Sequence, residues 1–237
     1  MTYKVTEGDD WVLYRSPAVE HESQEMIAQL GRSYRQFKQT FTGFDSSLTS
    51  RELTVGSLPD IFNVEEQHEK DKEFLNNMSE GFSGYRFYNL FALTSPSPLF
   101  WLLYRDIRTV VRTTLNTDEP LWFQCWMNMH KPDQVLNWHD HKFDYHGYVS
   151  IDPKDSITKF HDPNTNVRYE IKNEVGNIYF GPGWDRKHKV CVNENYSGNR
   201  ITLGYDIHTQ PDLPVSYTHL RAHETKANLV CRLLLEK

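Results

Sequence analysis

The chain has 237 residues, a formal net charge of −6, 38% hydrophobic residues and 14% aromatic residues. This composition is typical of a folded globular chain and excludes an intrinsically disordered one, and the length suffices for one substantial core. No cluster of lysine and arginine is long enough to follow a phosphate backbone, so a nucleic-acid partner is not expected. The most apolar window, "PLFWLLYRDIRTVV", is too short to cross a bilayer, and the N-terminus lacks the apolar part of a signal peptide, so a cytoplasmic protein is expected. The three cysteines are too far apart to suggest a disulfide framework.

The first half of the sequence has the pattern of helices. Ser16 and Pro17 form a helix start, and apolar residues at helical spacing predict a helix over 17–39. Residues 40–60 are rich in Gly, Ser, Thr and Asp and indicate a long excursion, after which a charged helix is expected at about 62–80. A third helix should follow the turn residues "TSPSP" and pack on a sheet, with an apolar face formed by Phe100, Leu103, Ile107 and Val111.

From residue 121 onward the sequence changes to short segments rich in Trp, Tyr, Val, Ile and Thr, separated by turn residues. Short strands with short turns favour a sandwich or jelly roll over a parallel sheet. We therefore expect a mainly β protein, a double-stranded β-helix of the jelly-roll or cupin type with N-terminal helices packed on the sheet. The predicted strands are 121–130, 145–151, 156–160, 167–171, 176–181, 187–193 and 199–207.

This pattern predicts a single domain over 1–213, in which 1–120 is a helical support and 121–207 is the β-helix core. The remaining segment, 214–237, resembles the translation of a sequencing-library adapter, a tail that recurs at the ends of metagenomic protein predictions. Residues of this tail are not counted as candidates for a functional site.

Histidines are concentrated in the β-rich half, and two of them are spaced for metal binding. Side chains two positions apart on a strand share a face, so His139 and His141 of "HDH" can reach one ion. His188, which follows the turn in "GNIYFGPGWDRKH", is the best candidate for a third ligand. Two clustered ligands and one distant ligand leave positions open, as in catalytic metal sites. The other histidines of this half are interpreted as surface or core residues: His130, His146, His161 and His208.

An arginine twelve residues after His188 points to an anionic ligand. Arg200 and Thr202 share a face of the last predicted strand. A guanidinium group is suited to a carboxylate, and a hydroxyl group two residues on can add a hydrogen bond. A basic residue beside a metal suggests an anionic cosubstrate that is held at both ends.

This combination resembles the iron(II)- and 2-oxoglutarate-dependent oxygenases, in particular the prolyl-hydroxylase-like groups. The resemblance covers about 121–207 and is carried by "HDH", "HGYVSID", "GNIYFGPGWDRKH" and "RIT". It implies that His139 and His188 bind iron(II) and that Arg200 with Thr202 holds the distal carboxylate of 2-oxoglutarate. The implied activity is that of a dioxygenase, which couples oxidative decarboxylation of 2-oxoglutarate to oxidation of a substrate.

The sequence departs from the family pattern at the middle iron ligand. The family has a carboxylate two residues after the first histidine, where this chain has His141. Strand parity favours His141 as the ligand, whereas the need for negative charge weakly favours Asp144. We take His139, His141 and His188 as the catalytic metal ligands and hold Asp144 in reserve.

Residues on the strand before the histidine pair can line the pocket, namely Gln124, Trp126 and Asn128, and Asn128 is counted with Arg200 and Thr202 as cofactor-binding. The substrate class stays open among a peptide side chain, a nucleotide, a lipid and a small metabolite, with a small molecule or peptide expected.

Two alternatives compete with the oxygenase interpretation. A cupin-type metalloprotein, acting as an isomerase, another dioxygenase or a binding module, would share the fold and the metal but leave Arg200 facing solvent. A non-catalytic roll would hold its histidines too far apart for one ion. A zinc hydrolase is less favoured because no HExxH motif is present.

Overall fold

The computed structural model describes most of the N-terminal region, 1–120, and most of the β-rich region, 121–207, that the sequence distinguishes. Three predicted segments lie outside the described residues: the excursion at 40–60, apart from Thr40, the helix at 62–80, apart from residues 72–73, and the tail at 214–237. The described ranges are 2–40, 72–73, 82–83, 89–94, 97–132, 136–192 and 196–209.

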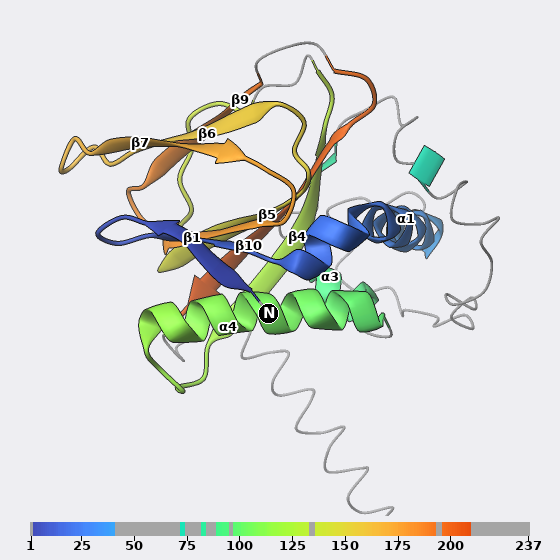
Figure 1. Cartoon of the computed structure of the whole chain (residues 1–237), viewed down its shortest axis with the longest axis horizontal. Coiled ribbons are helices and arrows are strands. Elements are labelled where there is room, and N and C mark those ends of the chain that lie inside the picture. The colour runs from blue at the N-terminus through green and yellow to red at the C-terminus, as the bar shows by residue number, and fades with distance from the viewer. Residues whose placement is uncertain are drawn as a thin grey trace, which may run out of the picture.

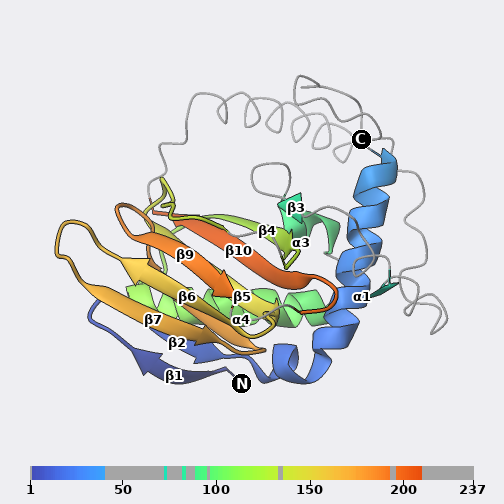
Figure 2. The ribbon, with the colours of Figure 1, turned by 90° about the horizontal axis from the view of Figure 1, so that it is seen from above.

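Two antiparallel sheets face each other in a double-stranded β-helix (Figures 1 and 2). All seven strands predicted from residue 121 onward are present, which confirms the predicted fold class. The major sheet has the order β1-β2-β8-β5-β10-β4-β3, and its strands are β1 (Tyr3–Glu7), β2 (Val12–Arg15), β3 (Phe82–Ser83), β4 (Trp122–His130), β5 (Tyr145–Asp152), β8 (Asn177–Pro182) and β10 (Arg200–His208). The minor sheet has the order β7-β6-β9, with β6 (Ser156–His161), β7 (Arg168–Asn173) and β9 (Lys187–Val192).

Helices cover the face of the major sheet that is turned away from the minor sheet (Figure 1). These are α1 (Pro17–Thr40), the short α3 (Leu90–Leu93) and α4 (Pro98–Leu115). The Ser97 side chain caps α4 by accepting a hydrogen bond from the backbone N–H of Phe100 at 3.2 Å, and Pro98 occupies the first turn. As predicted, α4 packs on the sheet through buried apolar residues at helical spacing, namely Phe100, Leu103, Ile107 and Val111.

The alternation of side chains along β10 separates the core from the space between the sheets. Residues facing the helices are apolar and fully buried, among them Leu203 and Ile207. The intervening residues face the minor sheet, and antiparallel pairing with β4 and β5 places polar side chains of these strands beside them. The second, smaller apolar cluster lies between the sheets and consists of Leu13, Tyr148, Phe160, Ile171 and Tyr179.

The N-terminal region is not only helical, which corrects the prediction of a helical support over 1–120. Strands β1 and β2 form a hairpin, and β2 pairs with β8 from Val12 opposite Phe180 to Arg15 opposite Asn177. The sequence 3–15 shows no clear two-residue alternation, because the exposed β1 carries no buried residue. Its strand state depends on pairing with a partner more than 160 residues away, which local sequence patterns do not encode.

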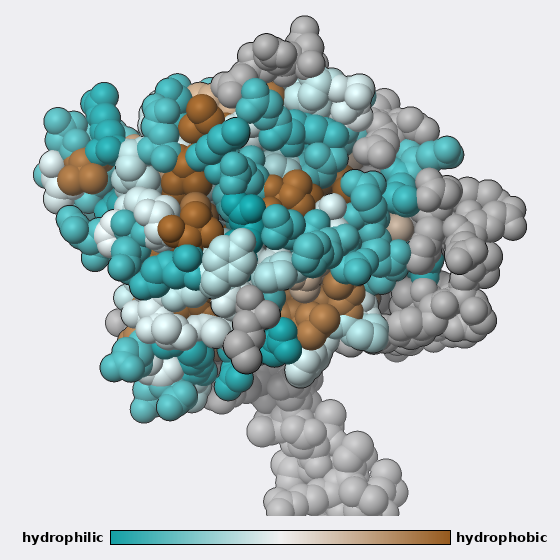
Figure 3. Space-filling model, viewed as in Figure 1, coloured by the Kyte–Doolittle hydropathy of each residue, from teal (hydrophilic) through white to brown (hydrophobic). Residues whose placement is uncertain are grey.

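The surface in the view of Figure 1 is predominantly polar, with apolar residues in small separate patches (Figure 3). Among the described residues, no helix has the length and apolar character needed to cross a membrane.

Candidate metal centre

A cavity of about 210 Å³ lies between the two sheets and receives nearly all the predicted site residues. Its wall combines imidazole rings, one guanidinium group, hydroxyl groups and a few apolar side chains. The lining residues are Trp126, Asn128, His130, Leu136, His139, Asp140, His141, His146, Tyr148, Thr158, His188, Val190, Arg200, Thr202 and Gly204.

Three predicted ligands converge at one end of this cavity. His139 and His188 form an antiparallel bridge, in which the two residues exchange backbone hydrogen bonds of 3.1 and 2.8 Å. Their ring centroids are therefore only 4.1 Å apart, and those of His141 and His188 are 5.4 Å apart. One ligand nitrogen of each of the three rings lies within 4.8 Å of the others. This spacing fits a single ion bound by three imidazoles.

Hydrogen bonds fix which nitrogen of these rings is available to a metal. Nδ1 of His139 lies 2.8 Å from the backbone carbonyl oxygen of Asn137, which can only accept, so Nδ1 carries the proton and Nε2 keeps its lone pair. Nδ1 of His141 lies 2.9 Å from the Oδ1 atom of Asp206. A carboxylate behind a histidine is a common way to orient a metal-binding ring and raise its basicity.

His146 is part of this arrangement, which corrects its interpretation as an ordinary surface or core residue. Its ring is buried and stacks on His141, with centroids 3.6 Å apart and planes 14° apart. Nδ1 of His146 lies 3.0 Å from the same Oδ1 atom of Asp206 that His141 approaches. Oδ1 of Asp206 therefore lies within 3.0 Å of Nδ1 of both rings and accepts a hydrogen bond from His146, and its other oxygen, Oδ2, is buried with no hydrogen-bond partner among the described residues.

The charge of this cluster is suited to a cation. Burial lowers the pKa of His139 and His188, and burial together with His141 lowers the pKa of His146 to about 4, so these rings are neutral near pH 7. Burial raises the pKa of Asp206, but hydrogen bonds from His141 and His146 outweigh it and hold the pKa below its usual value. Neutral imidazoles around one buried carboxylate leave a negative charge that a bound divalent ion would offset, so the residues fit a metal.

The opposite part of the cavity wall carries a buried positive charge. Arg200 is 3% exposed and Thr202 is 4% exposed, and both line the cavity as the strand parity predicted. Burial lowers the pKa of Arg200 to about 10, so the guanidinium group remains charged near pH 7. Its Nε donates to the Ser156 hydroxyl at 3.2 Å, and in the part of the chain that the structure describes no carboxylate forms an ion pair with it. A buried guanidinium group without a carboxylate is a site for an anionic ligand.

The structure directs Asp144 away from the histidines. Its Oδ2 atom accepts from the backbone N–H of Thr209 at 2.7 Å and lies 3.0 Å from Nδ1 of His208. The reserve ligand is thus held at the end of β10 by other partners and does not join the three-histidine group.

The remaining candidates divide between the cavity and its surroundings. Trp126 and Asn128 line the cavity, and the indole N–H of Trp126 donates to Oδ1 of Asn128 at 3.1 Å, whereas Gln124 is not among the lining residues. A Cβ atom at Gly204 would lie 2.5 Å from the indole of Trp126, so glycine is needed for this close approach. His130 lines the cavity, which its interpretation as a plain residue did not anticipate.

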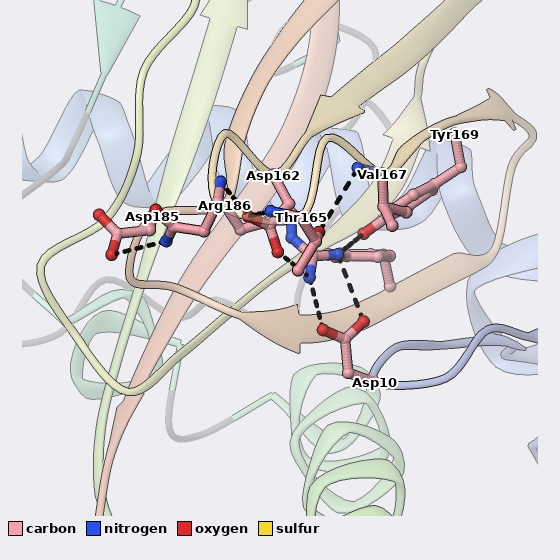
Figure 4. A network of polar contacts seen from close by, with 9 residues as sticks. Asp10, Asp162, Thr165, Val167, Tyr169, Asp185 and Arg186 are labelled. Carbon is pink, nitrogen blue, oxygen red and sulfur yellow. Dashed lines mark hydrogen bonds and ion pairs between the residues drawn. The ribbon is translucent and has the colours of Figure 1, made fainter.

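Arg186, two residues before His188, anchors the loop that carries this ligand (Figure 4). Its guanidinium group bonds to the Asp10 carboxylate from the N-terminal hairpin, lies 3.4 Å from Oδ2 of Asp162, and donates to the Tyr169 hydroxyl at 3.1 Å. This network joins the hairpin, β7 and the β6–β7 turn to the start of β9. The hairpin that the sequence did not predict therefore helps to position a predicted ligand.

Two residues of this site, Asp206 and Tyr148, were missed by the sequence analysis. Both could have been found by extending strand parity, because Asp206 continues the face of Arg200 and Thr202, and Tyr148 continues the face of His146. The hydroxyl group of Tyr148 is buried and has no hydrogen-bond partner of ordinary geometry in the described part of the chain. It is an additional group in the cavity wall that can bind a ligand.

Comparisons with known proteins relate the chain to others by fold alone. No protein-family profile matches the sequence, and no curated protein matches it. Among solved structures, the chain is similar to a 2OG-Fe(II) oxygenase family oxidoreductase from Burkholderia pseudomallei, with 13% identity, a TM-score of 0.39, and coverage of 47% of this chain and 58% of that one. It is also similar to a Pseudomonas putida prolyl-4-hydroxylase (10% identity, TM-score 0.37, 47% and 65% coverage) and to iron-bound HygX from Streptomyces hygroscopicus (12% identity, TM-score 0.41, 60% and 77% coverage). The match thus spans less than two thirds of the first two of these proteins.

Proposed function

We propose that the protein is an iron(II)- and 2-oxoglutarate-dependent oxygenase that oxidises a substrate at the histidine end of the cavity. The observation that carries the proposal is the presence of two complementary ends in one cavity. Three imidazole nitrogens within 4.8 Å of one another are suited to a metal, and the buried Arg200 is suited to a carboxylate.

The two ends match the two functional groups of 2-oxoglutarate. His139, His141 and His188 would hold iron(II) through their neutral nitrogens and leave positions on the ion open. Arg200 and Thr202 would bind the distal carboxylate of the cosubstrate, with the Tyr148 hydroxyl group next to them in the wall. Iron(II), when bound, supplies the redox chemistry that couples oxidative decarboxylation of 2-oxoglutarate by dioxygen to substrate oxidation, with succinate and carbon dioxide as coproducts.

The other residues of the site orient the ligands and exclude water. Asp206 holds the ring of His141 through Nδ1, and the peptide carbonyl of Asn137 does the same for His139. Trp126, Leu136 and Val190 form apolar parts of the wall. Such a wall limits the access of water to the reacting groups.

The orientation of Arg200 favours this function over a cupin-type protein that does not use 2-oxoglutarate. The cupin alternative expects Arg200 and Thr202 to face solvent, and both are buried in the cavity wall. The spacing of the histidines also argues against a roll that binds no metal.

The proposal is tested by adding iron(II) and 2-oxoglutarate to the protein without oxygen and recording the visible spectrum. A charge-transfer band is expected, because the cosubstrate would bind the metal through its keto and carboxylate oxygens. Admission of oxygen should then yield succinate. The absence of both the band and succinate with wild-type protein would overturn the proposal.

A further inference from the structure

The outer face of the minor sheet is basic, although the whole chain is acidic. Strand pairing places residues of β6, β7 and β9 in three rows on this face: Ile157 with Lys172 and Cys191, Lys159 with Glu170 and Lys189, and His161 with Arg168 and Lys187. We call these residues the basic face. It holds five cations and a single carboxylate, whereas the chain has a net charge of −6.

Most of these cations are available to a partner. Only Lys159 is paired, with Glu170 at 2.7 Å; among the described residues no carboxylate lies within ion-pair distance of Arg168, Lys172, Lys187 or Lys189. No described helix or strand crosses this face, which is turned toward the viewer in Figure 2. The four cations come from two different strands, so the sequence shows no run of basic residues.

Trp138 adds an aromatic surface at the edge of the basic face. The bridge between His139 and His188 extends the minor sheet beyond β9, and it places Trp138 beside Lys189. The Lys189 ammonium group lies 5.1 Å from the centroid of the Trp138 ring, and His161 meets that ring edge-on at 6.2 Å. Trp138 is nevertheless 45% exposed. An aromatic ring beside cations on an open sheet is a surface on which a nucleic-acid base can stack.

The basic face is continuous with the rim of the cavity. Trp138 directly precedes the proposed ligand His139, and Leu136 on the same segment lines the cavity. Lys187 and Lys189 flank the proposed ligand His188, with their side chains on the outer side of β9 and that of His188 on the inner side. A chain that lies along the basic face and passes Trp138 would therefore arrive at the opening of the cavity.

From this surface we infer that the protein binds single-stranded nucleic acid, with phosphates along the basic face and a base on Trp138. That this nucleic acid is also the substrate class of the site rests on the proposed oxygenase function. An acidic peptide would complement the charge equally well, but carboxylate side chains make no use of an exposed tryptophan. A nucleic-acid partner was not expected from the sequence because the sequence contains no contiguous run of lysine and arginine. A folded sheet can bring basic residues of separate strands together, so a basic surface does not require such a run.

The test measures binding of a fluorescein-labelled twelve-nucleotide oligo(dT) to metal-free protein by anisotropy, at a series of KCl concentrations. Because metal and 2-oxoglutarate are absent, the result is independent of the proposed oxygenase function. With four available cations, the slope of log K against log salt should approach about −2.8, at about −0.7 for each phosphate contact on a single strand. The double substitution Lys187→Gln and Lys189→Gln should make this slope less steep by about 1.4.

Trp184 provides a matched control for Trp138. It is 52% exposed and its ring centroid lies 5.2 Å from the ammonium group of Lys142, so it is also an exposed tryptophan beside a lysine, but it is not part of the basic face. Trp138→Ala should weaken oligo(dT) binding about 5-fold or more, the amount expected for one stacked base, and Trp138→Tyr should restore most of it. Trp184→Ala should leave binding unchanged.

Three results would overturn the inference. They are no binding of oligo(dT) at 20 mM KCl, equal losses in Trp138→Ala and Trp184→Ala, and equally tight binding of a labelled poly-glutamate peptide. The last result would identify the basic face as a site for acidic protein segments. Circular dichroism of each variant shows whether a loss of binding comes from unfolding.

Discussion

The two ends of the cavity have opposite electrostatic character and are built by different means. At the histidine end, the buried carboxylate of Asp206 lies beside His141 and His146, and burial lowers the pKa of His139, His146 and His188. At the arginine end, Arg200 is buried with a hydroxyl partner, and no carboxylate of the described residues forms an ion pair with it. Burial of an unpaired charge costs free energy at each end. A metal ion at the histidine end, with a dianion that reaches from it to Arg200, would offset both charges.

In the proposed metal site, a buried carboxylate lies behind a ligand ring instead of taking the ligand position. The iron ligand position that the family resemblance assigns to a carboxylate is held by His141, and the negative charge of Asp206 lies directly behind this ring. The predictions below separate the contributions of ligand, cosubstrate clamp and orienting carboxylate.

The largest effect is expected for removal of a ligand at the histidine end. His188→Ala should weaken iron(II) binding by more than the roughly 100-fold that is typical for loss of an outer-shell partner. Anaerobic calorimetry measures this affinity. His208→Ala is the matched control, because His208 contacts Asp144 outside the three-histidine group. Equal affinities of the two variants would show that His188 is not a ligand.

A selective effect is expected at the arginine end. Arg200→Gln removes one member of a buried charge pair with the cosubstrate, so 2-oxoglutarate affinity should fall by about 30-fold or more while iron(II) affinity is retained. Equilibrium binding to the metal-loaded protein measures both. The exposed Arg108 of α4 offers the control substitution Arg108→Gln. Unchanged 2-oxoglutarate affinity in Arg200→Gln would refute the assignment of the clamp.

A smaller effect is expected for the carboxylate behind His141. Asp206→Asn keeps the size of the side chain but removes its charge, so iron(II) affinity should fall about 10-fold. Asp144→Asn should leave it unchanged, because Asp144 is bonded to His208 and Thr209. A larger loss of iron(II) affinity in Asp144→Asn than in Asp206→Asn would mean that Asp144 is the carboxylate of the site.

An effect of a different kind concerns the pH dependence of stability in the metal-free protein. Burial, with smaller contributions from Arg200 and His139, lowers the pKa of His130 to about 4 from an ordinary value of 6.5. The unfolded chain therefore binds more protons between these values, and stability is fully present above pH 6.5 and decreases as the pH falls toward 4.

This contribution of His130 has a slope of at most about 1.4 kcal/mol per pH unit. Urea unfolding at pH 4.5, 5.5 and 7 should show a weaker pH dependence in His130→Asn than in wild type. A dependence that is identical in both proteins would show that His130 titrates normally.

Strand alternation explains how much of the site could be predicted from sequence. Arg200 and Thr202 share a face of β10, as strand parity indicated, and both line the cavity. His139 and His141 also line it, although residues 140–144 form no strand and Asp140, between the two histidines, lines the cavity as well. The role of Asp206 could not be read from a motif, because it depends on the register that places it opposite His146. Pairing across 60 residues is a property of the folded sheet, and a local pattern does not contain it.

The same reason accounts for the differences in the fold. The seven strands of the second half are rich in aromatic and β-branched residues and are separated by turn residues, and all seven were predicted. The hairpin of β1 and β2 was not predicted, because it is stabilised by β8 and by the contact of Asp10 with Arg186. The residues that stabilise this hairpin are distant from it in the sequence.

The most direct test of the central claim is a calorimetric titration of 2-oxoglutarate into the protein with and without anaerobically bound iron(II). If the cosubstrate spans the two ends of the cavity, iron(II) should tighten its binding at least 10-fold, and the gain should disappear in His188→Ala. Equal affinity with and without iron(II) would contradict the claim that one ligand connects the histidine end to Arg200.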